Sequence, residues 1–439
     1  MNYRMTHGPR LATAAAALLV AACGGSSSPS APSTPTASSA SAPTPTPRPG
    51  PPDIIFVLAD DMGWGDLGVY GSPLIKTPSI DRLAAEGSRF DAMYVPTPVC
   101  APSRGSILTG RYGVRNGVAW NDSTSLKTTE ITIAKLLKDR GYTTAMIGKW
   151  HLGSKVANLP LRAGFDSFYG MLSSPPDTDF IRGDQVTSDF PGMDMLTRRL
   201  TDEATAVIKK ASPDKPLFLY MAHHAPHTPN WASRDFAGRS GGGPYGDSVS
   251  ELDWSVGEIM RVMRETGRDT NALVLFVSDN GPEAAGSPGP FTYGKGNINE
   301  GGVRIPAIAW RPGRIPADRV IKDAASTMDF FPTFASLAGA PLPGDRDYDG
   351  TDISRLLSGE VEAIPGPGVG GRREFLFFVS RDAAAIRSGK WKYIRAGFRD
   401  SIPVLYDIEA DPAETNSLRR FNPDIVNLLD KRITQLKPK

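Results

Sequence analysis

Four short apolar runs, each ending directly in polar or charged residues, constrain the fold of this chain more than any other feature. The runs cover residues 54–58, 143–147, 217–222 and 273–277. Continuous apolar runs of this length are typical of strands buried on both faces, as in a parallel sheet covered by helices. Because helical patterns fall between the runs, the sequence predicts an open α/β sheet. Ligands bind outside the carboxyl ends of strands in such sheets, so the polar residues there are candidates for one shared site.

The helical patterns and the C-terminal part of the sequence suggest two folded regions. Helices are expected at residues 80–86, 196–210, 249–266 and 328–337, and in a segment capped by Thr129 whose apolar face includes Ile133, Leu136 and Leu137. After about residue 345, short strands are expected at 375–379, 384–386, 391–394 and 404–407, followed by an amphipathic helix at 425–436. We therefore expect a main domain over residues 53–345 and a smaller antiparallel-sheet subdomain with one helix over residues 346–439.

The first 52 residues differ in composition from the rest of the chain. An apolar run at residues 11–22 is too short for a permanent membrane-spanning helix, and it ends in Val20-Ala21-Ala22-Cys23-Gly24. This ending resembles a bacterial lipoprotein signal, which implies that residues 1–23 are a signal peptide and that Cys23 is lipidated. Residues 24–52, almost wholly Ser, Pro, Thr, Ala and Gly, are expected to form a disordered linker. We therefore expect an exported lipoprotein, anchored to a membrane and located in the periplasm or at the cell surface.

The second of the two cysteines, Cys100, stands in a different context, and no disulfide is expected. It begins the segment Cys100-Ala101-Pro102-Ser103-Arg104, in which Pro102 suits the first turn of a helix. A helix N-terminus favours an anionic nucleophile or a bound oxyanion. From the residues alone, Cys100 is either a buried structural cysteine or a nucleophile of the cysteine-protease kind.

Oxygen donors follow two of the predicted strands. Asp60 and Asp61 follow the run at 54–58, and Asp279 and Asn280 follow the run at 273–277. Oxygen-only ligands select a hard cation such as Ca²⁺ or Mg²⁺ over zinc. Two adjacent acids at a buried strand end repel each other unless a cation lies between them. The sequence therefore predicts a metal site. The net charge of +2, by contrast, gives no basic field that would favour nucleic acid as a partner.

Four histidines follow predicted strands, and they are interpreted in two ways. His223 and His224 are interpreted as structural residues, whereas His227 can donate the proton that an alkoxide leaving group needs. Three cations, Arg104, Lys149 and Lys295, are candidates for stabilising a tetrahedral oxyanion as its charge develops.

Two motifs resemble the signatures of the type I, formylglycine-dependent sulfatases. The first is Cys-x-Pro-Ser-Arg at Cys100 with Leu108-Thr109-Gly110-Arg111 after it, and the second is Gly148-Lys149-Trp150-His151-Leu152-Gly153. The resemblance runs from about residue 53 to residue 416 and is closest in style to arylsulfatases and N-acetylgalactosamine-6-sulfatases. It implies an alkaline-phosphatase-like α/β fold with a mixed sheet flanked by helices. It also implies that residues 53–345 form the catalytic domain.

The resemblance also implies a cofactor, a modification and a set of site residues. A dedicated maturation enzyme is expected to oxidise Cys100 to formylglycine (3-oxoalanine), and one Ca²⁺ ion is expected to bind. The implied metal ligands are Asp60, Asp61, Cys100 (through the formylglycine oxygen), Asp279 and Asn280. The implied catalytic residues are Cys100, Arg104, Lys149, His151, His227, Lys295 and Asp279.

Individual roles follow from the same resemblance. Arg104 holds the formylglycine, His151 bonds its hydroxyl and assists sulfate elimination, and His227 serves the leaving group. Asp279, beside the metal, can take the proton from the attacking hydroxyl. A hydrated aldehyde carries two hydroxyls on one carbon, so that one attacks sulfur and the other later expels sulfate by regenerating the aldehyde.

The expected function is hydrolysis of sulfate monoesters, with a sulfated small molecule or carbohydrate as substrate. Contacts beyond the sulfate are expected from loops at residues 120–122, 173–182 and 231–246. Two alternatives remain. One is a phosphonate or phosphate ester hydrolase of the same superfamily, and the other is a non-catalytic surface lipoprotein that binds sulfated glycans.

Overall fold

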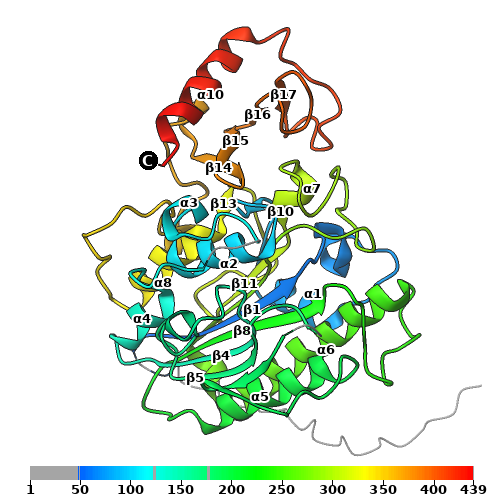
Figure 1. Ribbon diagram of the computed structural model, residues 1–439, viewed down its shortest axis with the longest axis vertical. Helices are drawn as coiled ribbons and strands as arrows, with labels where there is room; N and C mark the ends of the chain where they lie inside the picture. The colour runs from blue at the N-terminus through cyan, green and yellow to red at the C-terminus, as the bar shows by residue number, and fades with distance from the viewer. Residues whose placement is uncertain (1–47, 49, 122–124, 176–177, 439) are drawn as a thin grey trace, which may run out of the picture. The chain divides into compact units, whose positions relative to one another are not determined.

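The computed structural model describes residues 48, 50–121, 125–175 and 178–438 (Figure 1). The predicted signal peptide with Cys23 and almost all of the predicted linker lie outside the described residues. So do Asp122 of the loop at 120–122 and residues 176–177 of the loop at 173–182. Among the helices that the structure describes, none combines the length and the apolar character needed to cross a membrane.

A ten-stranded mixed sheet forms the centre of the protein, as the sequence predicts (Figure 1). In spatial order its strands are β12 (Arg319–Ile321), β2 (Ser88–Phe90), β11 (Ala307–Trp310), β9 (Ala272–Ser278), β1 (Asp53–Asp60), β8 (Leu217–Pro226), β4 (Thr143–Lys149), β5 (Ser167–Met171), β6 (Phe180–Arg182) and β7 (Gln185–Val186). Strands β9, β1, β8, β4 and β5 are parallel, and β11 and β6 flank them in antiparallel pairing. The four predicted apolar runs are thus four adjacent parallel strands.

The apolar runs are continuous because both faces of the sheet are buried. In β1, Ile54, Phe56 and Leu58 point into one core, whereas Ile55 and Val57 point into the other. Helices α2 (Cys100–Thr109), α4 (Ile133–Lys138) and α8 (Phe330–Leu337) contribute to the first core, and α1 (Pro78–Ala85), α5 (Leu196–Lys210) and α6 (Gly243–Glu265) to the second. Each fully buried side chain of this size contributes about 1.5–3 kcal/mol.

Two predicted helix starts are wrong. Helix α4 is capped by Thr132, whose Oγ1 accepts a hydrogen bond from the Lys135 backbone amide at 3.2 Å, rather than by Thr129. A cap must directly precede the first helical residue to reach the free amides of the first turn. Helix α6 begins at Gly243, six residues before the predicted start, because Pro244 fits the first turn although glycine and polar residues weaken the apolar pattern there.

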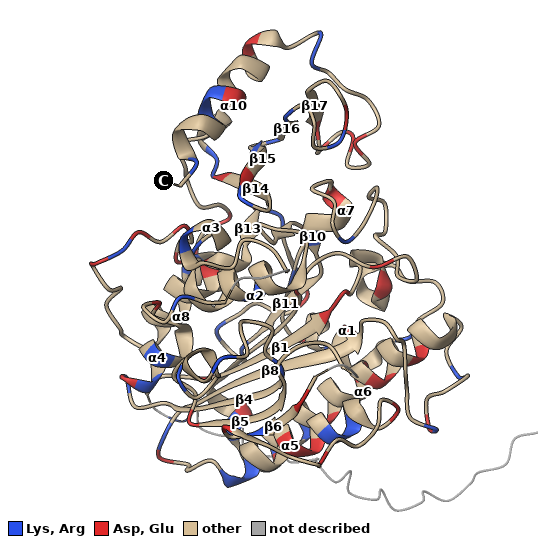
Figure 2. Ribbon diagram, in the orientation of Figure 1, with Lys and Arg blue, Asp and Glu red and all other residues tan. Residues whose placement is uncertain are grey.

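The outer helices carry charges of both signs. Figure 2 shows Lys, Arg, Asp and Glu interspersed along α5, α6 and α10 (Pro423–Leu436). The shorter helices are α3 (Gly113–Asn116), α7 (Glu300–Val303) and α9 (Ser354–Leu357), with 3-10 turns η1 (Trp64–Asp66), η2 (Gly68–Tyr70), η3 (Val156–Asn158), η4 (Arg268–Asn271), η5 (Thr327–Asp329) and η6 (Val369–Gly371). Three short strands, β10 (Arg304–Ile305), β3 (Met93–Tyr94) and β13 (Ala325–Ser326), form a separate small sheet in that order.

The predicted C-terminal antiparallel sheet is present. It consists of β14 (Glu374–Val379), β15 (Asp382–Ser388), β16 (Trp391–Ile394) and β17 (Val404–Asp407). Alternate residues of β14 face opposite sides: Phe375 and Phe377 join the main core, and Leu376 and Phe378 pack in a separate core with α10. Helix α9 lies after the boundary predicted between residues 345 and 346, and yet it packs in the main core. The position of this boundary therefore stays a prediction.

A buried polar network connects this sheet to the main body. Lys392 Nζ on β16 lies 2.8 Å from Glu300 Oε1 on α7 and 3.1 Å from Glu414 Oε1, and none of the three side chains is exposed. The Tyr94 hydroxyl donates to Glu300 Oε2 at 2.6 Å and accepts from Arg387 Nη1 at 2.6 Å. Buried charges require such partners.

Candidate active site

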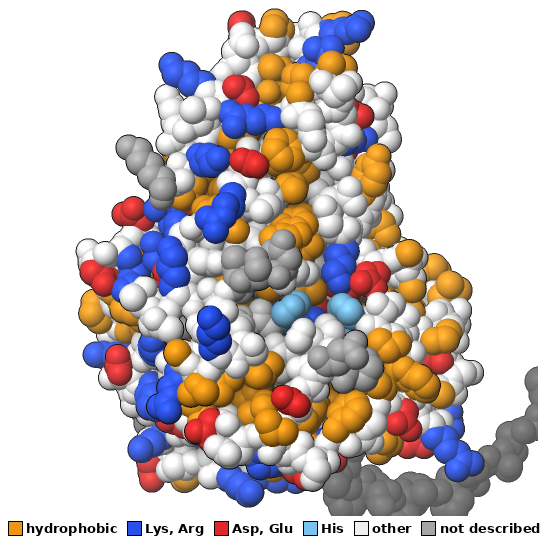
Figure 3. Space-filling view, in the orientation of Figure 1, with side chains coloured by type: hydrophobic (Ala, Val, Ile, Leu, Met, Phe, Trp, Pro, Cys, Tyr) orange, Lys and Arg blue, Asp and Glu red, His pale blue; other side chains and the backbone are white. Residues whose placement is uncertain are grey.

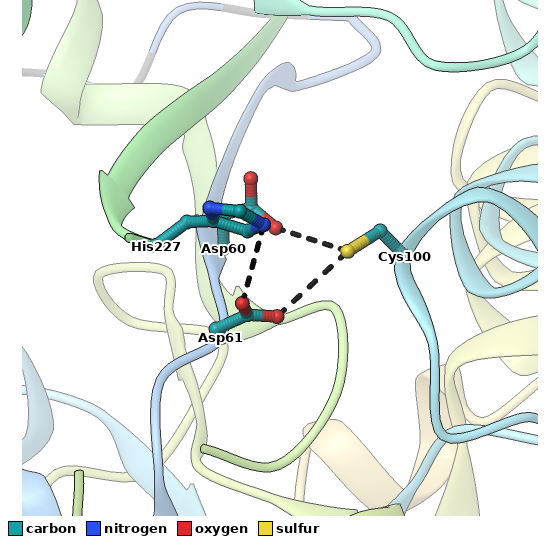
Figure 4. A group of neighbouring side chains, drawn as sticks. All are labelled: Asp60, Asp61, Cys100 and His227. Atoms are coloured by element: carbon teal, nitrogen blue, oxygen red, sulfur yellow. Dashed lines mark hydrogen bonds and ion pairs between the residues drawn. The ribbon is translucent and has the colours of Figure 1, made fainter. Parts of the chain in front are cut away.

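The predicted polar clusters meet at the carboxyl ends of β9, β1, β8 and β4. Asp60 is the last residue of β1, Asp61 follows it, and His227 follows β8 (Figure 4). Cys100 reaches them from the other side, as the first residue of α2. Residues up to about 220 positions apart in the chain are neighbours because these strands are parallel and adjacent in the sheet.

Cys100 lies at the N-terminus of a fully buried helix, as predicted. Its Sγ lies 3.3 Å from Asp60 Oδ1 and 3.7 Å from Asp61 Oδ1 (Figure 4). The backbone amide of Ala101 donates to Asn121 Oδ1 at 2.9 Å, so one free amide of the first turn is satisfied by a side chain from a distant loop.

The surroundings of Cys100 do not suit a thiolate nucleophile. Burial raises the pKa of the thiol well above its ordinary value, and the negative charge of Asp60 raises it further. Among the described residues, the hydrogen-bond partners of Sγ are two carboxylates rather than an imidazole. A cysteine-protease nucleophile needs a basic partner that takes its proton, so the geometry argues against that alternative.

Three buried or nearly buried cations surround the aspartates. Lys149 Nζ lies 2.6 Å from Asp60 Oδ2, and neither side chain is exposed. Lys295 Nζ lies 2.6 Å from Asp61 Oδ2, and the Lys295 side chain is 17% exposed. Arg104 Nη2 lies 2.8 Å from Asp279 Oδ2 and 3.4 Å from Asp60 Oδ1. The structure therefore brings together all three cations that the sequence identifies.

The surroundings of the three aspartates shift their pKa values in different directions. Burial, together with the negative charge of Asp60, raises the pKa of Asp279 to about 7 and that of Asp61 to about 6. Burial also opposes ionisation of Asp60, but Lys149 and Arg104 hold the pKa of its carboxyl well below the ordinary value. Asp60 is therefore the acid most firmly kept as a carboxylate.

Four side chains are placed so that they could hold a metal ion. The ligand atoms of Asp60, Asp61, Cys100 and His227 lie within 4.8 Å of one another. Asn280 donates from Nδ2 to Asp61 Oδ1 at 2.7 Å, while its buried Oδ1 has no hydrogen-bond partner among the described residues. An orphaned buried acceptor beside mutually repelling carboxylates is the arrangement that a bound cation relieves.

Asp279 is placed differently from the other predicted ligands. Its Oδ1 accepts from the Asp61 backbone amide at 3.1 Å, and its Oδ2 is engaged by Arg104. His227 belongs to the cluster, since its Nε2 lies 3.5 Å from Asp61 Oδ2, although it is not among the predicted ligands. The assignment of individual ligands stays a prediction.

His151 and His227 border the same cluster. Burial, together with the positive charges of Lys149 and Arg104, lowers the pKa of His151 to about 3, so this imidazole is neutral. Its backbone has a positive φ of 59°, as has Asp61 at 64°. Such conformations in residues other than glycine concentrate at functional sites. In Figure 3, histidine side chains reach the surface near the centre of the face shown.

The two remaining described histidines differ from each other. His223 is buried and its Nε2 lies 3.1 Å from Ser255 Oγ on α6, a contact that fits a structural role. His224 is also buried, but its Nδ1 lies 3.8 Å from Asp60 Oδ2 and its ring centroid is 5.0 Å from that of His227. His224 therefore belongs to the site, although the sequence analysis interprets it as a structural residue.

Glu283 is a second site residue that sequence reasoning missed. Its Oε1 lies 2.9 Å from Lys295 Nζ, and its Oε2 accepts a hydrogen bond from Thr228 Oγ1 at 2.6 Å. The only signal in the sequence is its position three residues after Asn280. Glu283 thus connects the loops that carry Lys295 and His227.

A glycine allows the strands to place Lys149. Gly148 has a φ of 103°, and a Cβ atom there would lie 1.9 Å from the Ala222 carbonyl oxygen on β8. Any other residue would push β4 and β8 apart directly before Lys149.

Comparison with known proteins gives consistent matches. A family profile described as Sulfatase matches residues 52–340. The chain is 41% identical over 353 residues to N-acetylgalactosamine-6-sulfatase of Canis lupus familiaris, which covers 72% of this chain and 68% of that protein. It is 39% identical over 426 residues to arylsulfatase A of Homo sapiens, which covers 87% and 82%.

A solved structure is also similar over most of the chain. It is described as the crystal structure of Ps i-CgsB in complex with k-i-k-neocarrahexaose. The TM-score is 0.79 at 29% identity, and the match covers 88% of this chain and 93% of that chain.

Proposed function

Because the chain belongs to the sulfatase family and is therefore a sulfuric ester hydrolase, we propose that Cys100 acts as formylglycine together with a bound Ca²⁺ ion. The observation that carries this proposal is the position of Cys100 Sγ, which lies at the helix N-terminus against Asp60 and Asp61. Oxidation would put one aldehyde oxygen, and hydration of the aldehyde two hydroxyls, where the thiol now faces two carboxylates. The hydrate of that aldehyde supplies one hydroxyl that attacks sulfur and a second that permits release of sulfate.

The residues proposed to hold the cation are Asp60, Asp61, Asp279, Asn280 and the oxidised Cys100. The mutual repulsion of the buried carboxylates and the unpartnered Asn280 Oδ1 support this set. Oxygen donors favour Ca²⁺ over zinc. When bound, the ion supplies positive charge that stabilises the sulfate oxygens and lowers the pKa of a coordinated hydroxyl.

The chain's own groups are proposed to carry the charge and proton steps. Lys149 and Lys295 bind the sulfate oxygens and stabilise charge that develops during attack. Nδ1 of His227 faces the Thr228 carbonyl oxygen and must therefore carry a hydrogen. In the doubly protonated imidazolium form, His227 gives the proton on Nε2 to the departing alcohol oxygen. Arg104 and Asp279 position the nucleophile, and Asp279 can take its proton. His151 bonds the hydroxyl of the formylglycine hydrate and assists release of sulfate.

The phosphonate or phosphate ester hydrolase is not favoured, because the curated relatives matched here are sulfatases. A non-catalytic glycan-binding protein is not favoured either. Substrates are sulfate esters of carbohydrates or aryl groups, and the structural relative that was solved with neocarrahexaose supports carbohydrates.

The test combines the modification with turnover. Peptide mass spectrometry of active protein should find the Cys100 peptide as the aldehyde, and preparations with more aldehyde should hydrolyse 4-nitrophenyl sulfate proportionally faster. Full activity in protein that contains only the Cys100 thiol would contradict the proposal.

We also propose that the mature protein is anchored to a membrane by lipid at Cys23 and is exported to the periplasm or the cell surface. The motif at residues 20–24 supports this location. The proposed partner in maturation is an enzyme that generates formylglycine.

A further inference from the structure

A cavity of about 500 Å³ opens beside the proposed sulfate-binding lysine. Its lining includes Glu283, Pro288, Tyr293 and Lys295, all from the loop that follows β9. Lys295 belongs both to this cavity and to the aspartate cluster, since its Nζ lies 2.6 Å from Asp61 Oδ2. A sulfate ester bound at Lys295 therefore has this cavity available for the group that carries the sulfate.

One wall of the cavity offers a hydrogen-bond acceptor. The Glu283 side chain is 29% exposed, and each of its oxygens already accepts one bond, from Lys295 and from Thr228. A carboxylate has about four acceptor positions, so two remain for a ligand. Hydroxyl groups are the donors that suit them. A second sulfate or carboxylate at this position would meet the charge of Glu283.

Tyr293 gives the cavity an apolar surface, because its aromatic side chain is 53% exposed. Its backbone has a φ of 63°, a conformation that non-glycine residues rarely adopt. The Arg399 guanidinium carbon lies 5.4 Å from the Tyr293 ring centroid and 5.3 Å from that of Tyr406. Arg399 Nη1 also donates to the Tyr406 hydroxyl at 2.6 Å. An arginine of the C-terminal region thus fixes the ring while much of its surface stays open.

An open aromatic ring beside a carboxylate with free acceptor positions is suited to a sugar. The C–H face of a pyranose stacks on an aromatic ring, and its hydroxyls donate to the carboxylate. Pockets of this kind combine apolar surface with a few placed polar groups. A phenyl leaving group can use the ring but has no hydroxyl for Glu283.

We propose that this cavity is the subsite for the leaving group, in which Tyr293 stacks on a pyranose ring and Glu283 accepts its hydroxyls. The favoured substrate is then a sulfated sugar with free hydroxyls rather than a sulfated phenol. Arg399 is a positioning residue that acts through Tyr293. This inference rests on the proposed function, because it requires the scissile sulfate to bind at Lys295.

The test compares two substrate classes with aldehyde-verified full-length protein. The sugar probes are the 6-sulfates of galactose, N-acetylgalactosamine and glucosamine, and the aryl probe is 4-nitrophenyl sulfate. For Tyr293→Ala we expect the ratio of kcat/KM on the best sugar to kcat/KM on the aryl sulfate to fall about 10-fold, mainly through KM. Tyr293→Phe should retain most of the wild-type ratio. Phe421→Ala, which removes an exposed aromatic ring that does not line the cavity, is the matched control and should leave the ratio unchanged.

Two further variants separate the roles. Glu283→Gln should lower the ratio about 10-fold, since it weakens a hydrogen bond to a charged acceptor. Arg399→Ala should lower it by less than Tyr293→Ala, and Arg399→Lys should restore it because a cation over the ring is kept. A purely structural role of Arg399 would reduce both activities equally and leave the ratio unchanged.

The outcomes distinguish the two levels of the proposal. If wild-type protein hydrolyses 4-nitrophenyl sulfate but none of the sugar sulfates, or if Tyr293→Ala changes both substrates equally, the subsite is overturned and the sulfatase mechanism stands. If aldehyde-bearing protein hydrolyses neither class, the proposed function fails and the subsite fails with it.

Discussion

Replacing Lys149 by methionine tests whether its buried ammonium group keeps Asp60 ionised. The two side chains pair at 2.6 Å with no exposed surface. Removing one partner of a buried ion pair typically costs about 3–5 kcal/mol, because the other charge is left uncompensated. Arg104 stays 3.4 Å from Asp60. We therefore expect the lower end, a loss of about 3 kcal/mol in the free energy of unfolding at pH 7.

The assay is equilibrium denaturation by urea in the presence of a chelator, so that a bound cation does not mask the effect. Lys138→Met is the matched control, since Lys138 Nζ pairs with Asp166 at 2.7 Å but the two side chains are 48% and 38% exposed. Its loss should stay below about 1 kcal/mol. Equal losses in the two variants would refute the reasoning.

The pH dependence gives a second check with a defined sign. Lys149 and Arg104 lower the pKa of Asp60 in the folded protein against the effect of burial. The carboxylate therefore contributes stability above its unfolded pKa of about 3.9, and this contribution is lost as the pH falls through the lower folded value. The deficit of Lys149→Met should be full at pH 7 and should shrink below about pH 4. A deficit that is independent of pH would contradict this account.

Three other variants test the chemistry, the metal site and the location. Cys100→Ser retains a hydroxyl that can attack sulfur but has no second hydroxyl to expel sulfate, so it should release at most about one alcohol per active site and then stop. Steady turnover without a sulfated serine would refute the hydrate mechanism. Asp279→Ala should weaken Ca²⁺ binding in calorimetric titration, chelation should abolish wild-type activity, and stoichiometric zinc in purified protein would count against the hard-cation assignment. Cys23→Ser should move the protein from the membrane to the soluble fraction or stall its processing, and unchanged membrane fractionation would disprove the lipid anchor.

The sequence predicts the sheet and most of the site because both depend on local patterns. The apolar runs mark strands buried on both faces, and the polar residues that follow them, such as Asp60 and Lys149, must meet if the strands are adjacent and parallel. The helix N-terminus at Cys100 is likewise readable from Pro102. The motif resemblance supplies the chemistry.

The remaining features depend on contacts that no local pattern encodes. The role of His224 is decided by the distance between the ends of β1 and β8, and that of Glu283 by the path of the loop after β9. Asn121 satisfies an amide at the start of α2 from twenty residues away. Helix α4 is capped by Thr132 instead of Thr129, and only the backbone geometry distinguishes these two nearby threonines.

The buried contact of Lys392 with Glu300 and Glu414 has a consequence for protein engineering. Glu300 lies five residues after Lys295, next to the loop that carries a proposed catalytic lysine. Truncation before β16 would remove Lys392 and leave Arg304 Nη1, at 3.3 Å from Oε2, as the ion-pair partner of this buried carboxylate. Deletion of the C-terminal sheet should therefore destabilise the main body, because a buried carboxylate loses one of its two cations. A chimera made with a relative should be more stable if the donor segment brings a cation to the position of Lys392.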